Sequence, residues 1–181
     1  MNVALKPMTV ESYLAWLEEQ PGWRYELVDG QVVAMNAQRV EHIDTKVAVI
    51  RALQDALRGG RCHALGDGMA VKIDEQTVYE PDALVYCGER LKPGTILMTA
   101  PVVVVEILSP GTKTVDTTKK LEGYFKLASV RHYLIIDPEA RAIVHHARDA
   151  AGAISTSVLS DGEVALDAVG ARVPVAACFA E

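Results

Sequence analysis

The sequence has no apolar run long enough to cross a bilayer. The apolar run Val102–Val105 after Pro101 is short, whereas a membrane-spanning helix needs about 20 consecutive apolar residues. The N-terminal segment MNVALKPMTVESY also lacks a charged n-region followed by an apolar h-region, so no signal peptide is predicted. We therefore expect a soluble, cytoplasmic protein with no membrane partner.

Cysteine is scarce, because the chain has only Cys62, Cys87 and Cys178. These residues are widely spaced and form no CxxC motif, which argues against a zinc ribbon or a redox motif. Free thiols are typical of a reducing cytoplasm. We expect all three cysteines to be unpaired and packed as small hydrophobic side chains.

An excess of positive charge is also missing. Lysine and arginine number 18 against 24 aspartates and glutamates, and the formal charge is −6. This balance argues against a protein that coats nucleic acid through its overall charge, although it leaves room for a local basic face. Half of the residues are apolar and 23% are charged, which excludes disorder. The length of 181 residues predicts one domain over residues 1–181.

The first half of the chain shows both helical and strand patterns. A first helix should begin after Thr9, a common N-cap residue, and stop at Pro21-Gly22. The segment YELVDGQVVAM predicts a hairpin with Asp29-Gly30 as its turn. A second helix should end at Gly59-Gly60, followed by strands near Ala70–Ile73 and Ala83–Tyr86. The apolar residues that mark the second helix are Ile43, Val47, Ile50, Leu53 and Leu57.

The second half contains the most hydrophobic segment, Pro101–Leu108, which predicts a strand buried on both faces. A third helix should run from Thr112 to about Ala128, before another buried strand at His132–Ile136. This order is compatible with a parallel crossover. The fold class is therefore α/β (mixed α+β), with a central mixed sheet flanked by helices. The C-terminal strands expected to form an antiparallel meander are Ala142–His146, Ser155–Leu159 and Glu163–Leu166.

Glu106 is anomalous because it interrupts the valine-rich strand in VVVVEIL. A buried carboxylate should be protonated, paired or bound to a cation, unless it reaches solvent at the strand end near Ser109-Pro110. A second acid, Asp82, follows Pro81 at the start of an expected strand. Two carboxylates at neighbouring strand ends form a hard-oxygen site that suits Mg²⁺ or Mn²⁺. Alternatively, Pro81-Asp82 is ordinary turn chemistry.

The third helix carries a polar stripe. Asp116, Lys120 and Tyr124 are spaced four residues apart, so each is rotated by only about 40° from the previous one. Lys120 could reach toward the strand that carries Glu106. The alternative is a surface Asp–Lys pair, which would contribute little.

Together these motifs resemble the Uma-two family of endonucleases, in the PD-(D/E)XK superfamily with the restriction-endonuclease-like fold. The resemblance extends from about Thr9 to Pro138, and the ordered series is more specific than any single motif. The motifs are YELVDG at 25–30, Pro81-Asp82, VEILSPGT at 105–112, Asp116, Lys120, Tyr124 and YLIIDP at 133–138.

The resemblance implies metal-assisted hydrolysis of DNA phosphodiester bonds. Asp82 and Glu106 would hold Mg²⁺ or Mn²⁺, and Glu26 would be a further ligand or a supporting carboxylate. The metal would activate the attacking water, and a lysine would offset the charge that develops on the phosphate. Superfamily members that cut both strands need two sites, so a homodimer is expected.

One position departs from the superfamily pattern. Leu108 stands where a lysine is expected two residues after the second acid. Lys120 from the next helix could supply the missing charge, and Asp82, Glu106 and Lys120 are therefore the predicted catalytic residues. If Lys120 does not reach the site, the alternative is a catalytically inactive, nucleic-acid-associated or dimeric interaction module on the same fold.

Several other residues have more than one interpretation. His42, Asp116 and Tyr124 could contact phosphate or support the metal ligands, although His42 could equally make a helix-cap contact. His145 and His146 point to opposite faces of a strand and are interpreted as structural. Basic residues could line a DNA-binding cleft or form solvated helix faces. These are Lys113, Lys119, Lys120 and Lys126 on the third helix, and Arg51, Arg58 and Arg61 in or after the second.

Overall fold

The computed structural model describes residues 7–22, 24–109 and 115–180, and only the backbone of residues 115–117. Its three helices are α1 (Val10–Glu18), α2 (Val40–Ala56) and α3 (Val115–Lys126). Two short 3₁₀ helices are η1 (Asp167–Val169) and η2 (Val175–Cys178). None of the helices formed by these residues has the length and apolarity required to span a bilayer.

The strands build three sheets. A five-stranded sheet has the order β2-β1-β5-β4-β7, with β1 (Tyr25–Val28), β2 (Gln31–Ala34), β4 (Ala70–Asp74), β5 (Thr77–Tyr79) and β7 (Leu97–Met98). A six-stranded sheet has the order β11-β10-β9-β8-β6-β3, with β3 (Cys62–Gly66), β6 (Ala83–Cys87), β8 (Val103–Ile107), β9 (His132–Asp137), β10 (Ala142–Arg148) and β11 (Ile154–Leu159). The third sheet pairs β12 (Glu163–Leu166) with β13 (Ala171–Pro174).

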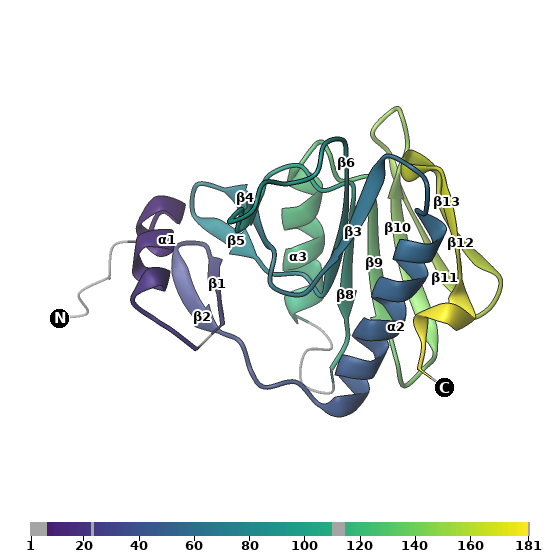
Figure 1. The fold of residues 1–181 in the computed structure, drawn as a ribbon, viewed down its shortest axis with the longest axis horizontal. Coiled ribbons are helices and arrows are strands. Elements are labelled where there is room, and N and C mark those ends of the chain that lie inside the picture. The colour runs from purple at the N-terminus through teal and green to yellow at the C-terminus, as the bar shows by residue number, and fades with distance from the viewer. Residues whose placement is uncertain (1–6, 23, 110–114, 181) are drawn as a thin grey trace.

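The six-stranded sheet is the centre of the molecule, with α2 on one face and α3 on the other (Figure 1). Its β8 and β9 strands are parallel and joined through α3, whereas the other pairs are antiparallel. The α1 helix and the β1–β2 hairpin lie at the opposite end of the molecule from β12–β13 (Figure 1). This arrangement confirms the predicted mixed sheet flanked by helices.

Alternation along β8 sends successive side chains to different layers. Val103, Val105 and Ile107 pack with the α2 side of the core. Val104 packs with the α3 side, and Glu106 therefore also points toward α3. The position of the acid within a valine-rich strand is thus explained by the helix that covers that face of the sheet.

Local signals account for most predicted boundaries. The Thr9 hydroxyl accepts a hydrogen bond from the Ser12 amide at 3.2 Å and caps α1. Asp29 and Gly30 both have positive φ, 50° and 76°, as the predicted two-residue hairpin turn requires. The predicted start of the third helix at Thr112 falls among residues 110–114, which lie outside the described residues, and α3 is described from Val115 to Lys126.

The apolar residues that mark the second helix do not all face the core. Ile43 and Val47 are 45% and 40% exposed, while Thr45 and Lys46 are buried. The reason is that α2 packs its apolar side chains against the sheet mainly through its C-terminal half. Its N-terminal half instead directs polar side chains to Asp82.

The predicted C-terminal meander is correct only for its first two strands. The β9, β10 and β11 strands are consecutive antiparallel neighbours, but β12 pairs with β13 in a separate sheet.

His145 and His146 make contacts within the protein. The His132 Nδ1 and His145 Nε2 atoms are 3.0 Å apart, and His146 Nδ1 lies 2.8 Å from the Thr156 hydroxyl.

The expectation of three free thiols is also wrong. Cys62 and Cys87 form a disulfide, and Cys178 is the free, buried cysteine. The two paired cysteines are opposite one another on β3 and β6, with their Cα atoms 3.9 Å apart. The β3 strand was not predicted from the sequence, so its register with β6 and the resulting disulfide could not be predicted either.

Candidate active site

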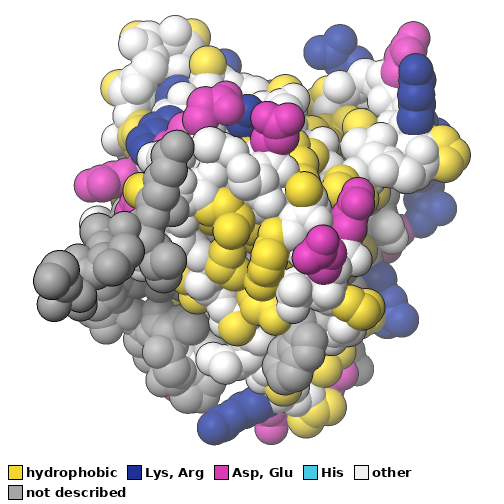
Figure 2. Space-filling model, turned by 90° about the vertical axis from the view of Figure 1, so that its left-hand side faces the viewer, with side chains coloured by type: hydrophobic (Ala, Val, Ile, Leu, Met, Phe, Trp, Pro, Cys, Tyr) yellow, Lys and Arg dark blue, Asp and Glu magenta, His cyan; other side chains and the backbone are white. Residues whose placement is uncertain are grey.

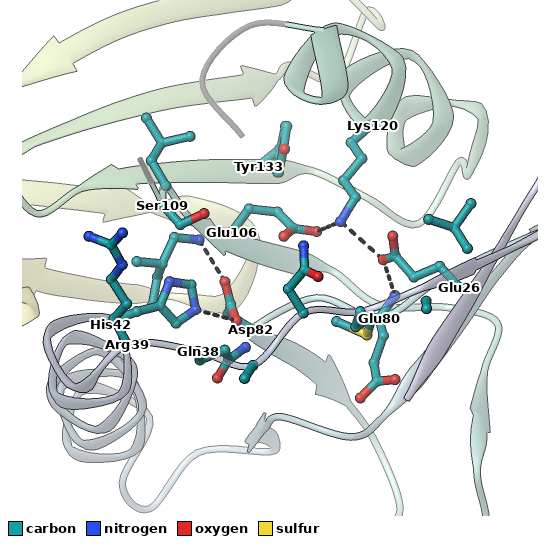
Figure 3. A pocket seen from close by; sticks show the side chains of 17 residues that line it. Glu26, Gln38, Arg39, His42, Glu80, Asp82, Glu106, Ser109, Lys120 and Tyr133 are labelled. Carbon is teal, nitrogen blue, oxygen red and sulfur yellow. Dashed lines mark hydrogen bonds and ion pairs between the residues drawn. The ribbon is translucent and has the colours of Figure 1, made fainter. Parts of the chain in front are cut away.

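The predicted acids and the predicted lysine line one cavity of about 480 Å³. Glu26, Asp82, Glu106 and Lys120 all line it, although they come from four separate segments of the chain (Figure 3). Antiparallel pairing of β6 with β8 places the start of β6 beside the end of β8. This topology is what brings Asp82, next to Ala83, close to Glu106.

Asp82 is held by both main-chain and side-chain groups. Its Oδ2 accepts a hydrogen bond from the Ile107 amide at 2.8 Å, and its Oδ1 lies 3.0 Å from His42 Nε2. Lys46 Nζ is 2.8 Å from the same Oδ1. Although burial opposes ionisation, contacts with His42 and Lys46 lower the pKa of Asp82. Asp82 is therefore an oriented, ionised carboxylate.

Glu106 has a different environment. Its Oε1 lies 3.1 Å from Lys120 Nζ and accepts a 2.7 Å hydrogen bond from the Tyr124 hydroxyl. Burial raises the pKa of Glu106 to about 7, with the negative charges of Asp82 and Glu26 acting in the same direction and Lys120 opposing them. A carboxylate with so high a pKa would be stabilised in its ionised form by an additional cation.

Lys120 points into the site rather than toward solvent. Its Nζ lies 3.0 Å from Glu26 Oε1 and 3.1 Å from Glu106 Oε1, and the residue is 7% exposed (Figure 3). The Glu80 amide also donates to Glu26 Oε1, at 2.8 Å. Glu26 thus bridges the β5 end of one sheet and the α3 lysine.

A glycine allows α3 to approach the site. A Cβ added to Gly123 would lie 2.6 Å from Cε2 of the buried Tyr79 ring. With no side chain at this position, α3 packs closely against Tyr79. The Tyr124 ring lies next to Tyr79 and Tyr133, with centroid distances of 5.3 and 5.1 Å. This packing fixes the helix that carries Lys120 and Tyr124.

A second buried lysine, Lys46, was not predicted from the sequence. Lys46 is 5% exposed, and its Nζ contacts Asp82, Asp67 at 3.2 Å and Gln38 at 2.8 Å. Arg24 in turn pairs with Asp67 and Glu80. The only available signal was a lysine four residues after His42, which does not distinguish a buried position from an exposed one.

The other predicted basic residues do not surround the cavity. Lys119 contacts Asp29 at 3.5 Å, Lys126 contacts Asp74 at 3.1 Å, and Arg58 pairs with Asp55. Arg51 and Arg61 are exposed and do not line the cavity. The Lys113 residue and the Asp116 side chain lie outside the described part of the structure.

The donor set fits a divalent cation, although no three His, Cys, Asp or Glu side chains among the described residues form a ready-made metal cluster. The connected charged groups comprise five carboxylates and three cations, which leaves two formal negative charges when His42 is left out of the count. Carboxylate oxygens are the ligands that Mg²⁺ and Mn²⁺ prefer. The carboxylates are Glu26, Asp67, Glu80, Asp82 and Glu106, and the cations are Arg24, Lys46 and Lys120.

Comparisons with known proteins identify the family and the fold. Residues 10–173 match the Uma2 family, which is described as "Putative restriction endonuclease". An uncharacterized protein of Synechocystis sp. is 30% identical over 144 residues, which cover 78% of this chain and 75% of the relative. A crystal structure from Anabaena variabilis, described as "a putative nuclease belonging to DUF820", has the same fold, with a TM-score of 0.76 and 19% identity over 96% of this chain and 98% of that chain. Because the family match covers most of the sequence, this chain belongs to the Uma2 family.

Proposed function

We propose that the protein is a divalent-metal-dependent endonuclease that hydrolyses DNA phosphodiester bonds. The observation that carries the proposal is the meeting of Asp82, Glu106 and Lys120 in one cavity, with Lys120 Nζ 3.1 Å from Glu106. The family and its fold support a nuclease. The metal, the substrate and the residue roles are part of the proposal.

Asp82 and Glu106 would hold Mg²⁺ or Mn²⁺. Such an ion supplies Lewis acidity to the phosphate and lowers the pKa of the attacking water. The water oxygen bonds to phosphorus while one bridging P–O bond breaks, and the leaving oxygen takes up a proton. The products are a phosphomonoester and a hydroxyl.

Lys120 offsets the negative charge that develops on the phosphate during this step. Glu26 positions Lys120, because its Oε1 accepts hydrogen bonds from Lys120 Nζ at 3.0 Å and from the Glu80 amide at 2.8 Å. Tyr124 orients Glu106 through its hydroxyl, and His42 orients Asp82. Lys120 therefore takes the place of the strand lysine that Leu108 replaces.

The homodimer and the cytoplasmic location are also proposals. Cutting both strands of a duplex by one site per chain requires two copies. Val40, Ile43 and Val47 form an exposed apolar stripe on α2, with exposures of 63%, 45% and 40%, which is the kind of surface that a partner covers. Sedimentation of the purified chain tests the oligomeric state.

A DNA substrate favours the cytoplasm, whereas the Cys62–Cys87 disulfide is unusual in that compartment.

The function is tested by incubating the wild-type chain with supercoiled plasmid and with single-stranded DNA. Reactions contain Mg²⁺, Mn²⁺ or excess EDTA. We expect nicked or linear products with either metal and none with EDTA. Equal product formation in EDTA would contradict metal dependence, and binding without cleavage in both metals would favour the inactive interaction module.

A further inference from the structure

The candidate active site continues into a second, smaller cavity. Besides the space of about 480 Å³ around the acids, there is a neighbouring space of about 230 Å³ bordered by Asp137, Pro138 and Glu139. The two spaces adjoin, because they share the lining residues Arg39, His42, Leu108 and Ser109. A strand of nucleic acid held at the acids therefore has a continuous groove to follow.

Among the described residues that line this groove, Arg39 is the cation that makes no ion pair. Lys120 also lines the larger cavity, but its ammonium group is already paired with Glu26 and Glu106. Arg39 lines both cavities and is exposed, and within the described ranges its side chain makes no hydrogen bond or ion pair. Its guanidinium lies on the Ser109 side of the cavity (Figure 3).

The rest of the groove would repel an anion. Its larger part includes Glu80, Asp82 and Glu106, and its smaller part includes Glu41 and Asp137. On the face shown in Figure 2, basic side chains are scattered and do not form one patch. The Arg39 guanidinium lies where the cavities meet and makes no ion pair with the described residues, so it is the feature that could hold a phosphate against this acidic lining.

A buried polar atom at the same junction lacks a partner. Nδ1 of His42 is buried and makes no hydrogen bond in the part of the chain that the structure describes, and His42 lines both cavities. Buried polar atoms generally have a protein, water or ligand partner. This atom is a second indication that the junction accommodates a polar group from outside the chain.

From these observations we propose that Arg39 binds a backbone phosphate of the DNA strand, next to the phosphate held at Asp82 and Glu106. The assignment rests on the proposed nuclease function and adds a substrate-binding determinant to it. Arg39 contacts the substrate and takes no part in bond cleavage. Its planar guanidinium can donate two parallel hydrogen bonds to one phosphate, a bidentate geometry that a lysine ammonium lacks.

The test measures binding of a short, fluorescently labelled DNA duplex by anisotropy, in EDTA and in Ca²⁺, at several salt concentrations. Arg39→Ala and Arg39→Lys are compared with Arg51→Ala, which removes an exposed arginine of the same helix that lines neither cavity. The Arg39 side chain makes no capping bond to α2, so its truncation should leave the fold intact, as circular dichroism and thermal unfolding will show.

We expect Arg39→Ala to weaken binding by about tenfold, as for a lost charge-assisted hydrogen bond, and to reduce the salt slope by about one. Arg39→Lys should weaken DNA binding less than Arg39→Ala does. The DNA affinity of Arg51→Ala should stay within about twofold of that of the wild type. If the wild type binds and cuts DNA while Arg39→Ala behaves like Arg51→Ala, the Arg39 assignment is wrong and the nuclease proposal stands. If the wild type neither binds nor cuts DNA, both are wrong.

Discussion

The ammonium group of Lys120 on α3 lies 3.1 Å from the Glu106 carboxylate on β8. The lysine comes 14 residues after the acid in the sequence and belongs to a different element. It supplies positive charge at the site although the strand position two residues after Glu106 is Leu108. The inference of an active site depends on this contact more than on any other.

Replacing Lys120 by alanine should affect both activity and stability. Loss of a donor that stabilises the transition state typically reduces the rate by about 10²–10³-fold. Glu26 and Glu106 would also lose their shared cation, and a buried ion pair broken in this way costs about 3 kcal/mol. Plasmid cleavage and urea unfolding measure the two effects. Lys119→Ala is the matched control, because Lys119 is exposed and contacts only the exposed Asp29 among the described side chains; equal effects of the two changes would contradict the assignment.

Replacing Gly123 by alanine should destabilise the protein, even though alanine is the better helix former by about 1 kcal/mol. The new Cβ would lie 2.6 Å from the Tyr79 ring, and overpacking of this kind costs about 1–3 kcal/mol. The shift of α3 should also displace Lys120 and reduce cleavage. Thermal unfolding and cleavage are compared with Glu122→Ala, at the exposed neighbouring position. A more stable Gly123→Ala variant would show that α3 is not held by this close approach.

Buried histidines should make stability depend on pH. Burial, together with His145, lowers the pKa of His132 from 6.5 to about 4, so the unfolded chain binds a proton at a higher pH than the folded chain does. His132 therefore favours folding above pH 6.5, and this contribution is lost as the pH falls from 6.5 to about 4. The total loss is about 3 kcal/mol.

Urea unfolding of the wild type and of His132→Gln across this pH range measures the contribution. Taking the difference between the two proteins removes the opposing contribution of Glu106, whose pKa is raised to about 7. His63→Gln serves as the control, because the described contacts of His132 and His145 do not include His63. Parallel pH profiles for wild type and His132→Gln would contradict the prediction.

The number of cysteines that react with a thiol reagent should depend on whether the protein is folded and on whether it is reduced. The disulfide leaves Cys178 as the free cysteine, and burial raises the pKa of its thiol to about 11. The native protein should therefore react very slowly with a thiol reagent at neutral pH. In denaturant without reductant we expect one reactive thiol per chain, and after reduction all three cysteines should react. Three reactive thiols before reduction would contradict the Cys62–Cys87 pair.

The sequence was most informative where one local rule applied. Glu106 stood out because an acid interrupts a run of valines, and strand alternation then directed it to the face covered by α3. The Thr9 cap and the Asp29-Gly30 turn depend only on neighbouring residues and were predicted correctly. The position of Lys120 beside Glu106 was expected from the family resemblance and the helical stripe together.

The features that were not predicted all depend on contacts between residues that are far apart in the sequence. Lys46 is buried because it pairs with Asp67 and Asp82, which come from later parts of the chain. The periodicity of the helix sequence does not indicate these ion pairs. Cys62 meets Cys87 only through the β3–β6 register. The apolar residues Ile43 and Val47 fit a helical face, but the sheet does not extend beneath them. In each case the decisive partner came from a different element.

The most direct test compares Mg²⁺-dependent plasmid cleavage by wild type, Glu106→Gln and Asp82→Asn, with the exposed Glu89→Gln as control. Circular dichroism confirms that each variant is folded. If Asp82 and Glu106 form the metal site, both variants lose cleavage while Glu89→Gln cuts at the wild-type rate. Wild-type cleavage by folded Glu106→Gln or Asp82→Asn would contradict the assignment of the active site.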